Sequence, residues 1–393
     1  MGNKKHYRFS FRKSRQILIL KLRLIKDRIE SFLRLPKCYS AIIRSRQYTK
    51  SRLGIWLDLL ELYFRYKIPP ESYFLCWLWC VPRSNWKYYF GSNYGEPQRT
   101  RLEKSVQPSK YQILFADKDI CERLCRSMGI RVPITLGIVR PDQNYKEKIS
   151  RLLEQSAEHI FVIKPIIGGG GRGIVLAKKY ENNIVIQSKS ETIGLDKFNL
   201  SDTVLLQEAI RQDKRMSVFS SYSVNTIRAV TMYTKKDFVI IIAALFRCGV
   251  GESYVDNWSA GGVAIGIDVE TGKLQKFGYD KNGNRYTEHP TSKVKFENFV
   301  IPEWTAIVNL SKKIQMAFPC YRILGLDIAL QEGGEPVLIE INEAPDLLGQ
   351  EQMSGPILKL ERNLRAFGEY DLLINKYQRE LYRNLLGRER SPN

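Results

Sequence analysis

Three oxygen-bearing side chains near the carboxyl end of the chain have the types and spacing of a metal site. Two alternating apolar runs, residues 324–330 and 336–342, flank two consecutive glycines. Glycines that adopt positive φ favour the tight turns of β-hairpins, so the segment is predicted to form an antiparallel hairpin. A turn centred on the glycines places Asp327 directly opposite Glu340, with Asn342 one step along the same face.

This arrangement indicates a bound cation, because carboxylates that face each other across a sheet destabilise it. Carboxylate and amide oxygens suit Mg²⁺, which is commonly bound together with phosphates. The simpler alternative is a hairpin whose polar face lies in water. We predict that Asp327, Glu340 and Asn342 bind Mg²⁺.

A glycine-rich segment joins two predicted strands and has the composition of a phosphate-binding loop. Its members are Gly168, Gly169, Gly170, Gly171, Arg172 and Gly173. Glycines allow backbone N–H groups to converge on an anion, and Lys164 on the preceding strand supplies a positive charge for phosphates. The segment is not a Walker loop, since no Gly-Lys-Ser/Thr follows and no helix begins there. The alternative is a flexible hairpin tip.

The composition is that of a globular protein with two or three packed units. Of 393 residues, 44% are hydrophobic and 11% aromatic. The seven cysteines form no CxxC pair and the three histidines are scattered, so the sequence supports neither a zinc site nor a Ser-His-Asp triad. The longest apolar runs, 74–81 and 238–246, are far shorter than the roughly 20 residues that span a bilayer. We therefore expect a cytoplasmic protein with reduced thiols.

The amino-terminal arm carries most of the excess positive charge. Residues 1–50 contain fifteen Lys or Arg and two acidic residues, which accounts for +13 of the net charge of +21. Apolar residues recur at helical spacing between the basic ones, at Leu18, Leu22, Ile25, Ile29, Phe32 and Leu33. Such a basic amphipathic helix could lie on the inner face of a membrane, bind nucleic acid, or dock on the protein's own core with a basic rim in water.

The periodicity along the chain predicts a mostly helical region at residues 1–110 and a mixed region after it. Asp117 is expected to cap a helix at 118–128. Further helices are predicted at 145–156, 302–318 and 356–386, and strands at 132–138, 159–165, 173–178, 183–187, 203–208, 226–233, 238–246 and 263–269. We divide the chain into the arm and helical region 1–110, parts 111–205 and 206–350 with the loop and the hairpin respectively, and C-terminal helices 351–393.

In residues 111–350 the order of motifs resembles the ATP-grasp superfamily, and within it the sugar-transfer-associated branch related to α-L-glutamate ligases and other carboxylate–amine ligases. The resemblance implies an α+β fold in which two subdomains grip ATP. The segments that carry it are 116–118, 162–165, the glycine loop, 206–210, 223–228, 256–262, 325–327 and 340–345.

The resemblance also implies the roles of individual residues toward ATP and Mg²⁺. Lys118 and Lys164 would hold the α- and β-phosphates, and the glycine loop would close over the β- and γ-phosphates. The adenine would be read by a hinge strand made of Gln207, Glu208, Ala209 and Ile210. An acidic ribose contact is expected soon afterwards, where Asp213 is the candidate. Asp327, Glu340 and Asn342 are again the metal ligands.

The resemblance further points to residues around the transferred phosphoryl group and the acceptor. Arg228 on a predicted strand would neutralise the phosphoryl group and the acyl phosphate; its simpler alternative is a surface arginine. Asn225 belongs to one of the matching segments. Asn257, Ser259, Gly261 and Gly262 form a polar loop that could approach the acceptor, or an ordinary turn.

We interpret the chain as an ATP-grasp ligase that activates a carboxylate as an acyl phosphate and joins it to an amine, releasing ADP. The resemblance suggests that it adds an amino acid to a sugar in surface polysaccharide assembly, with a nucleotide-sugar or lipid-linked glycan among the substrates. One alternative is an ATP-grasp kinase that phosphorylates a hydroxyl, with Asp256 as base. The other is a protein that depends on aminoacyl-tRNA or nucleic acid, which the lack of aromatic-basic motifs disfavours.

Overall fold

The computed structural model describes residues 18–19, 21–91, 97–181, 183–188, 191–254, 256, 258 and 261–390. The chain forms two compact units. The first comprises residues 1–109, 234–238 and 344–393, and the second comprises 110–233 and 239–343. The units therefore interleave along the sequence, and both segments that carry the predicted chemistry, the glycine loop and the carboxylate hairpin, belong to the second unit.

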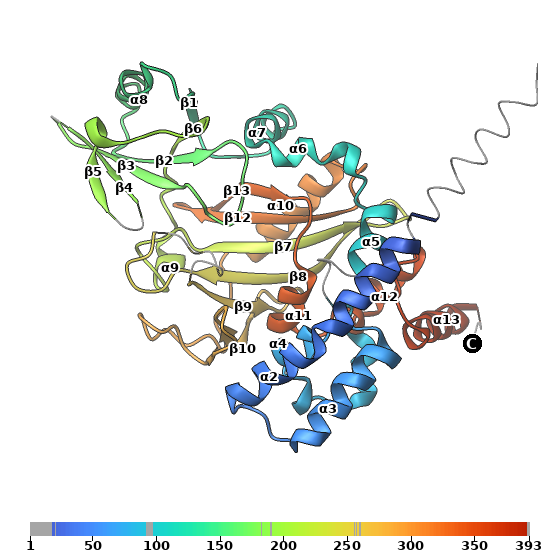
Figure 1. The fold of residues 1–393 in the computed structure, drawn as a ribbon. Helices are drawn as coiled ribbons and strands as arrows, with labels where there is room; N and C mark the ends of the chain where they lie inside the picture. Colours follow the sequence, from blue (N-terminus) through green and yellow to red (C-terminus); the bar gives the residue numbers. More distant parts are fainter. Residues whose placement is uncertain are drawn as a thin grey trace, which may run out of the picture. The chain divides into compact units, whose positions relative to one another are not determined.

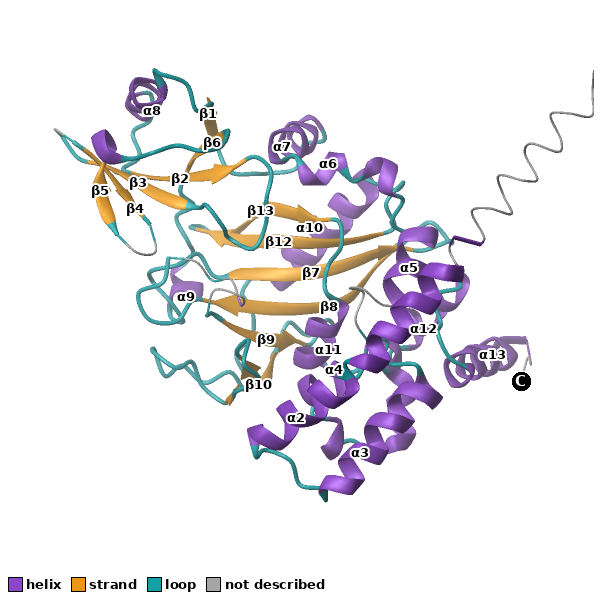
Figure 2. Cartoon of the chain, viewed as in Figure 1, coloured by secondary structure: helices purple, strands orange, loops and turns teal. Residues whose placement is uncertain are grey.

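The second unit is built on two antiparallel sheets (Figures 1 and 2). The smaller sheet has the order β1-β6-β2-β3-β4-β5, with strands Thr135–Val139, Val204–Glu208, Ile160–Pro165, Val175–Lys179, Ile184–Gln187 and Thr192–Gly194. The larger sheet has the order β11-β10-β9-β8-β7-β12-β13, with strands Arg285–Tyr286, Leu274–Tyr279, Val263–Ile267, Val239–Cys248, Thr226–Tyr233, Ile323–Gln331 and Glu335–Asn342. The predicted division of the chain at 205/206 would cut strand β6. Strand β6 pairs with both β1 and β2, so all of it belongs to the smaller sheet.

The hairpin β12–β13 confirms the predicted pairing of Asp327 with Glu340, although by a different route. Gln331 pairs with Glu335, which leaves a three-residue connection instead of the expected two-residue turn. A β-bulge next to Ile339 then shifts the register by one residue between Asp327 and Ile328. The longer connection shifts the pairing by one residue and the bulge shifts it back, so Asp327 and Glu340 lie opposite each other.

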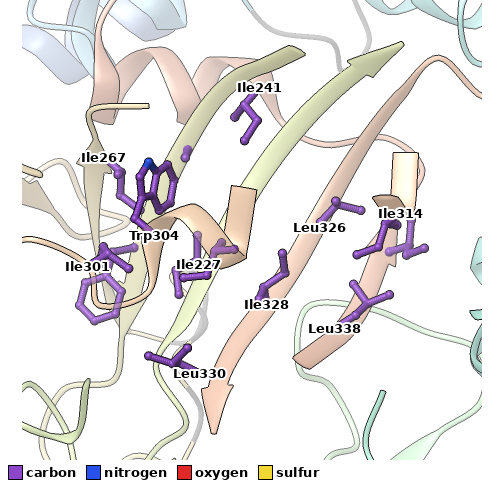
Figure 3. Packing of buried hydrophobic residues seen from close by; sticks show 14 of the residues in the cluster. Ile227, Ile241, Ile267, Ile301, Trp304, Ile314, Leu326, Ile328, Leu330 and Leu338 are labelled. Atoms are coloured by element: carbon purple, nitrogen blue, oxygen red, sulfur yellow. The ribbon is translucent and has the colours of Figure 1, made fainter. Parts of the chain in front are cut away.

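Successive side chains along the strands of the larger sheet point to opposite faces. Ile227, Leu326 and Ile328 point into the main hydrophobic core (Figure 3). Helix α10, Trp304–Ala317, adds Ile307 and Ile314 to the same core. Arg228 on β7 and Asp327 on β12 alternate with these strand residues and therefore face the other side of the sheet.

The remaining helices of the second unit are short. They are α6 (Ile113–Ala116), α7 (Lys118–Ser127), α8 (Tyr145–Glu154) and α9 (Lys214–Ser217). Asp117 caps α7 as predicted, since its side chain accepts a hydrogen bond from the Ile120 N–H group. Helix α8 packs Ile149 and Leu153 against the smaller sheet, which gives that sheet a core of its own.

The first unit is helical, as expected (Figure 2). Residues 21–33 are helical. They are followed by α2 (Leu35–Ser45), α3 (Arg52–Glu61), a short π-helix at Leu62–Tyr66, α4 (Glu71–Leu75), α5 (Pro97–Ser105), α11 (Leu347–Ser354), α12 (Glu361–Glu369) and α13 (Lys376–Arg390). The predicted helix over 356–386 is interrupted between α12 and α13, where Asp371 adopts φ 55°. Asn375 then caps the next helix by accepting a hydrogen bond from the Gln378 N–H group.

Candidate functional site

A polar row crosses three neighbouring strands of the larger sheet. Asp327 on β12 lies opposite Glu340 on β13 and opposite Arg228 on β7. The Arg228 guanidinium donates to both carboxylate oxygens of Asp327, at 2.8 Å for the Nη2–Oδ2 pair and closer still for Nε–Oδ1. Asn342 reaches the same carboxylate, with its Nδ2 atom 3.5 Å from Oδ2. Four residues that the sequence singled out are thus brought together.

A second arginine, Arg247 on β8, extends the row. Its Nη2 atom lies 2.9 Å from Oδ2 of Asp327 and donates at 2.8 Å to the Thr226 hydroxyl oxygen. Burial alone would raise the pKa of Asp327, but the charges and hydrogen bonds of Arg228 and Arg247 outweigh it and hold that pKa at about 2. Asp327 is therefore ionised and held in a fixed orientation.

Asp256 lies beside this row. Its Oδ2 atom accepts a hydrogen bond from the Thr226 hydroxyl and is 3.8 Å from Nε of Arg247. Burial raises the pKa of Asp256, and the nearby Arg247 and Thr226 offset only part of this effect. The row thus has one carboxylate whose pKa is lowered and a neighbour whose pKa is raised, a pattern typical of acid–base sites.

Lys118 connects the carboxylate hairpin to the glycine loop. It is the first residue of α7, and its ammonium donates to the Gly168 carbonyl at 2.5 Å and lies 3.3 Å from Oε1 of Glu340. A backbone bridge between Asp117 and Ile167 fixes the start of the helix against the start of the loop. A positive charge therefore lies between the backbone of the loop and the metal-type carboxylate.

The glycine loop lies between β2 and β3, and four of its glycines adopt positive φ. Gly173 is held at φ +73°, where an added Cβ atom would lie 2.8 Å from Cγ of Pro165. At Gly169 an added Cβ would meet nothing within 4 Å. The base of the loop thus requires glycine, whereas its tip, including the exposed Arg172, is open.

A buried polar network lies behind the loop. Lys164 on β2 and Gln207 on β6 both contact Glu122 of α7, with Nζ–Oε1 at 3.0 Å and Nε2–Oε2 at 2.8 Å. Thr135 completes the network by donating to Glu122 at 2.8 Å. Lys164 is 5% exposed, so its charge is balanced inside the protein by a carboxylate from another element.

The predicted adenine-reading segment, residues 207–210, begins in the last two residues of β6 and continues just beyond it. The N–H groups of Glu208 and Ala209 donate at 3.0 Å to the carbonyls of Ile134 and Ile160. The carboxylate of Glu208 accepts a hydrogen bond from the Ser156 hydroxyl at 2.5 Å. Ile210 follows as the last residue of the segment.

Asp213, the candidate ribose ligand, caps the short helix α9. Both of its oxygens accept hydrogen bonds from the Arg215 side chain, at 2.8 and 3.0 Å. These hydrogen bonds lower the pKa of Asp213. The carboxylate is therefore already engaged in a local contact.

The predicted acceptor residues divide into three groups. Asn225 is fully buried, and its Nδ2 atom donates at 3.0 Å to the carbonyls of Met216 and Ser220, so it holds the preceding loop together. Gly262 lies close to backbone, since an added Cβ would be 2.3 Å from the Asp256 carbonyl oxygen, and Gly261 adopts φ +108°. Asn257 and Ser259 lie outside the described residues.

Sequence reasoning missed Arg247 and Glu122. Arg247 carries the only charge in the sequence of β8, VIIIAALFRC, and a lone charge in a strand that is apolar throughout is a signal of a paired internal site. Glu122 has no comparable signal, because charged residues are ordinary in helices. Its partners Lys164 and Gln207 are distant in sequence and only the fold brings them together.

The donor set of the row fits Mg²⁺ in its chemistry. Asp327, Glu340 and Asn342 offer carboxylate and amide oxygens, the ligands of hard divalent cations. Within the described part of the chain, no group of three or more His, Cys, Asp or Glu residues could hold a metal ion, and the predicted set consists of two carboxylates and the Asn342 amide. Arg228 and Arg247 already pair with the negative charge of Asp327, and Lys118 pairs with that of Glu340.

Comparison with protein families gives a match to the sugar-transfer associated ATP-grasp family over residues 97–364. The chain belongs to this family, and its α+β fold is the ATP-grasp fold. The match covers the glycine loop, both arginines and the carboxylate hairpin. A comparison with curated proteins gives no match.

Solved structures with a similar fold include D-alanine-D-alanine ligase from Helicobacter pylori, at 12% identity and a TM-score of 0.37, covering 66% of this chain and 60% of that one. N5-carboxyaminoimidazole ribonucleotide synthetase from Thermotoga maritima is 12% identical with a TM-score of 0.34, covering 68% and 57%. The ATP-grasp ligase PsnB with its minimal precursor is 13% identical with a TM-score of 0.37, covering 70% and 63%. The chain thus spans less than two thirds of the length of these ligases.

Proposed function

We propose that this chain is an ATP-dependent carboxylate–amine ligase that forms an amide through an acyl phosphate and releases ADP and phosphate. The observation that carries the proposal is the row Glu340–Asp327–Arg228, with Arg247 beside it and Lys118 leading to the glycine loop. Family membership supports ATP as the energy source.

In this proposal the chain binds ATP through residues of the second unit. Lys118 and Lys164 hold the α- and β-phosphates, and the exposed glycine loop closes over the β- and γ-phosphates. The N–H groups of Glu208 and Ala209 already donate hydrogen bonds to carbonyls of the protein. The backbone at Ile210 and the carbonyls of the segment therefore bind the adenine. A ribose contact by Asp213 has to compete with Arg215.

Asp327, Glu340 and Asn342 would hold Mg²⁺ in the same proposal. When bound, Mg²⁺ neutralises phosphate charge and orients the triphosphate. The arginine contacts hold the pKa of Asp327 at about 2, so near neutral pH the carboxylate needs no deprotonation to serve as a ligand. Lys118, next to Glu340, is placed to exchange its carboxylate contact for a phosphate.

The chemistry needs charge stabilisation more than a base. The attacking carboxylate is already ionised near neutral pH, since ordinary carboxyl pKa values lie near 4. Arg228 and Arg247 present two guanidinium groups on one face of the sheet, where they stabilise the negative charge of the transferred phosphoryl group and of the acyl phosphate.

We place the substrates in the chemistry of sugars. The family's description as sugar-transfer associated supports an amino acid and a sugar, free or as a nucleotide-sugar or lipid-linked glycan, as the partners that are joined. The product would be an amide on a surface polysaccharide or its precursor. We do not expect nucleic acid as a substrate, and treatment with ribonuclease should leave the activity unchanged.

A second candidate function is phosphoryl transfer to a hydroxyl. The specific observation in its favour is Asp256, a buried carboxylate with a raised pKa next to Arg247, because a hydroxyl nucleophile needs a base. In the ligase the same residue can accept a proton from the acceptor ammonium. Only the ligase forms an acyl phosphate.

The test screens amino acids, uronic acids and amino sugars for stimulated ADP release and then adds hydroxylamine. We expect a hydroxamate that requires the carboxylate substrate and ATP, and that is lost in Arg228→Gln while the matched surface variant Arg151→Gln retains it. A stimulated ADP release that yields a phosphorylated hydroxyl and no hydroxamate would overturn the ligase in favour of the kinase.

A further inference from the structure

The helical residues 21–33 pack on the first unit through a polar face. Asp27 and Ser31 are buried, and Asp27 accepts a hydrogen bond from the Thr100 hydroxyl at 3.1 Å. The Arg28 guanidinium lies 3.7 Å from the centre of the Tyr63 ring and donates to the Tyr63 carbonyl at 2.8 Å. These contacts fix which side of the helix faces inward, and that side is the polar one.

The apolar side of the same helix faces outward. Leu22, Ile25 and Ile29 are 58%, 56% and 54% exposed, although they are the residues that an ordinary surface helix buries. Of the three alternatives for this helix, docking of the apolar stripe on the protein's own core is therefore not the one that the described residues adopt. Docking uses the buried side chains Asp27 and Ser31 instead, and Asp27 accepts the hydrogen bond from Thr100.

The exposed stripe continues onto a neighbouring element. The ring centres of Phe32 in the helix and Phe64 in the π-helix are 6.1 Å apart. Both side chains line a groove of about 540 Å³ together with Ile25 and Ile29. Leu53 and Leu57, four residues apart on α3, are 68% and 50% exposed. Apolar side chains from the helix 21–33, from α3 and from the π-helix thus form one candidate membrane surface, residues 22–32 with 53–64.

Positive charge surrounds these apolar side chains. Lys26 and Arg23 expose 74% and 49% of their side chains while they pair with Glu30 and Glu103, and Lys21 is exposed as well. The charge of +13 over residues 1–50 contrasts with +8 for the other 343 residues. Interleaved lysines disfavour a protein partner, since the centres of protein interfaces are depleted of Lys. Nucleic-acid affinity comes mainly from phosphate contacts, which a stripe of aliphatic side chains does not make.

We infer that this surface binds an anionic lipid bilayer, with the helix lying in the plane of the headgroups. The apolar side chains would enter the boundary of the acyl chains and the lysines would meet lipid phosphates. Among the described residues no helix is both long and apolar enough to cross a membrane, so the contact is peripheral. The inference does not rest on the proposed ligase activity.

The test is co-sedimentation of the full chain with vesicles of phosphatidylcholine alone and with added phosphatidylglycerol. We expect binding to the anionic vesicles that weakens with salt. Leu22→Glu/Ile25→Glu/Ile29→Glu should abolish it, and Lys21→Gln/Lys26→Gln should lower the partition coefficient about 25-fold, since each basic residue near the surface contributes about fivefold. The substituted positions are exposed, so the fold should persist, which circular dichroism checks.

Control variants make the same kinds of substitution in the second unit, at one apolar and two basic positions. Met316→Glu, at a position 61% exposed on α10, and Lys276→Gln/Lys295→Gln should leave vesicle binding unchanged. Equal sedimentation with both vesicle types, or none with either, would overturn the inference. So would self-association that the apolar substitutions abolish in the absence of vesicle binding.

Discussion

At the scale of single residues, the site depends on how charges are paired on one face of a sheet. Asp327 receives two arginines, from β7 and from β8, and only one of the two is expected from the sequence. The lone charge at Arg247 in an apolar strand costs free energy unless it is paired, which the contacts with Asp327 and Thr226 achieve. This pairing makes Arg247 a candidate for direct contact with the transferred phosphoryl group.

Arg247→Gln tests this role. We expect the rate of ADP formation to fall by a factor on the order of 10³, because the stabilised charge develops mainly in the transition state. The affinity for MgADP, measured by titration calorimetry, should change far less. Arg151→Gln, an exposed arginine on α8, is the matched control, and an equal loss in both variants would contradict the role.

At the scale of elements, the sequence predicts strands and pairing well where the alternation is strong. Strand β7 has the predicted bounds, Thr226–Tyr233, and the pairing of Asp327 with Glu340 is confirmed. The bulge next to Ile339 could not be predicted, because a one-residue shift leaves no mark in composition. The outward apolar face of residues 21–33 could not be predicted either, since periodicity identifies the faces of a helix but not which face packs.

The glycine loop offers a test at this scale. Gly173→Ala should lower the free energy of unfolding by about 1–3 kcal/mol, because its φ of +73° and its contact with Pro165 exclude a side chain. Gly169→Ala, with open space around it, should change stability by less than about 0.5 kcal/mol. Urea unfolding followed by circular dichroism measures both. Equal effects would show that the base of the loop does not require glycine.

At the scale of the whole molecule, the two units carry different features. The second unit holds every described residue of the candidate ATP site, and the first holds the exposed apolar helix with its basic flanks. The first unit also holds Glu351 on α11, a buried carboxylate that accepts hydrogen bonds from the N–H groups of Phe90, Gly91 and Ile357. Its protonation ties the stability of this unit to pH.

Burial, partly offset by the three N–H groups, raises the pKa of Glu351 to about 8. A carboxyl whose pKa is higher in the folded protein stabilises the fold at low pH, and this stabilisation is lost as the pH rises from about 4.5, its ordinary value, to about 8. We expect the first unit to unfold at lower urea at pH 8 than at pH 5. Glu351→Gln, which imitates the protonated form, should remove this difference. A wild-type midpoint that is constant or rises with pH would contradict the assignment.

The most direct test of the central claim is calorimetric binding of MgADP to Glu340→Gln and to Glu335→Gln. Both glutamates lie on β13, but only Glu340 lies beside Lys118 and Asp327, whereas Glu335 pairs with Arg131 at the hairpin turn. The proposed site predicts that Glu340→Gln lowers the affinity at least tenfold, because the loss of one metal ligand or charge-assisted contact has about that effect. Glu335→Gln should not change the affinity. Unchanged binding in both variants, or an equal loss in both, would contradict it.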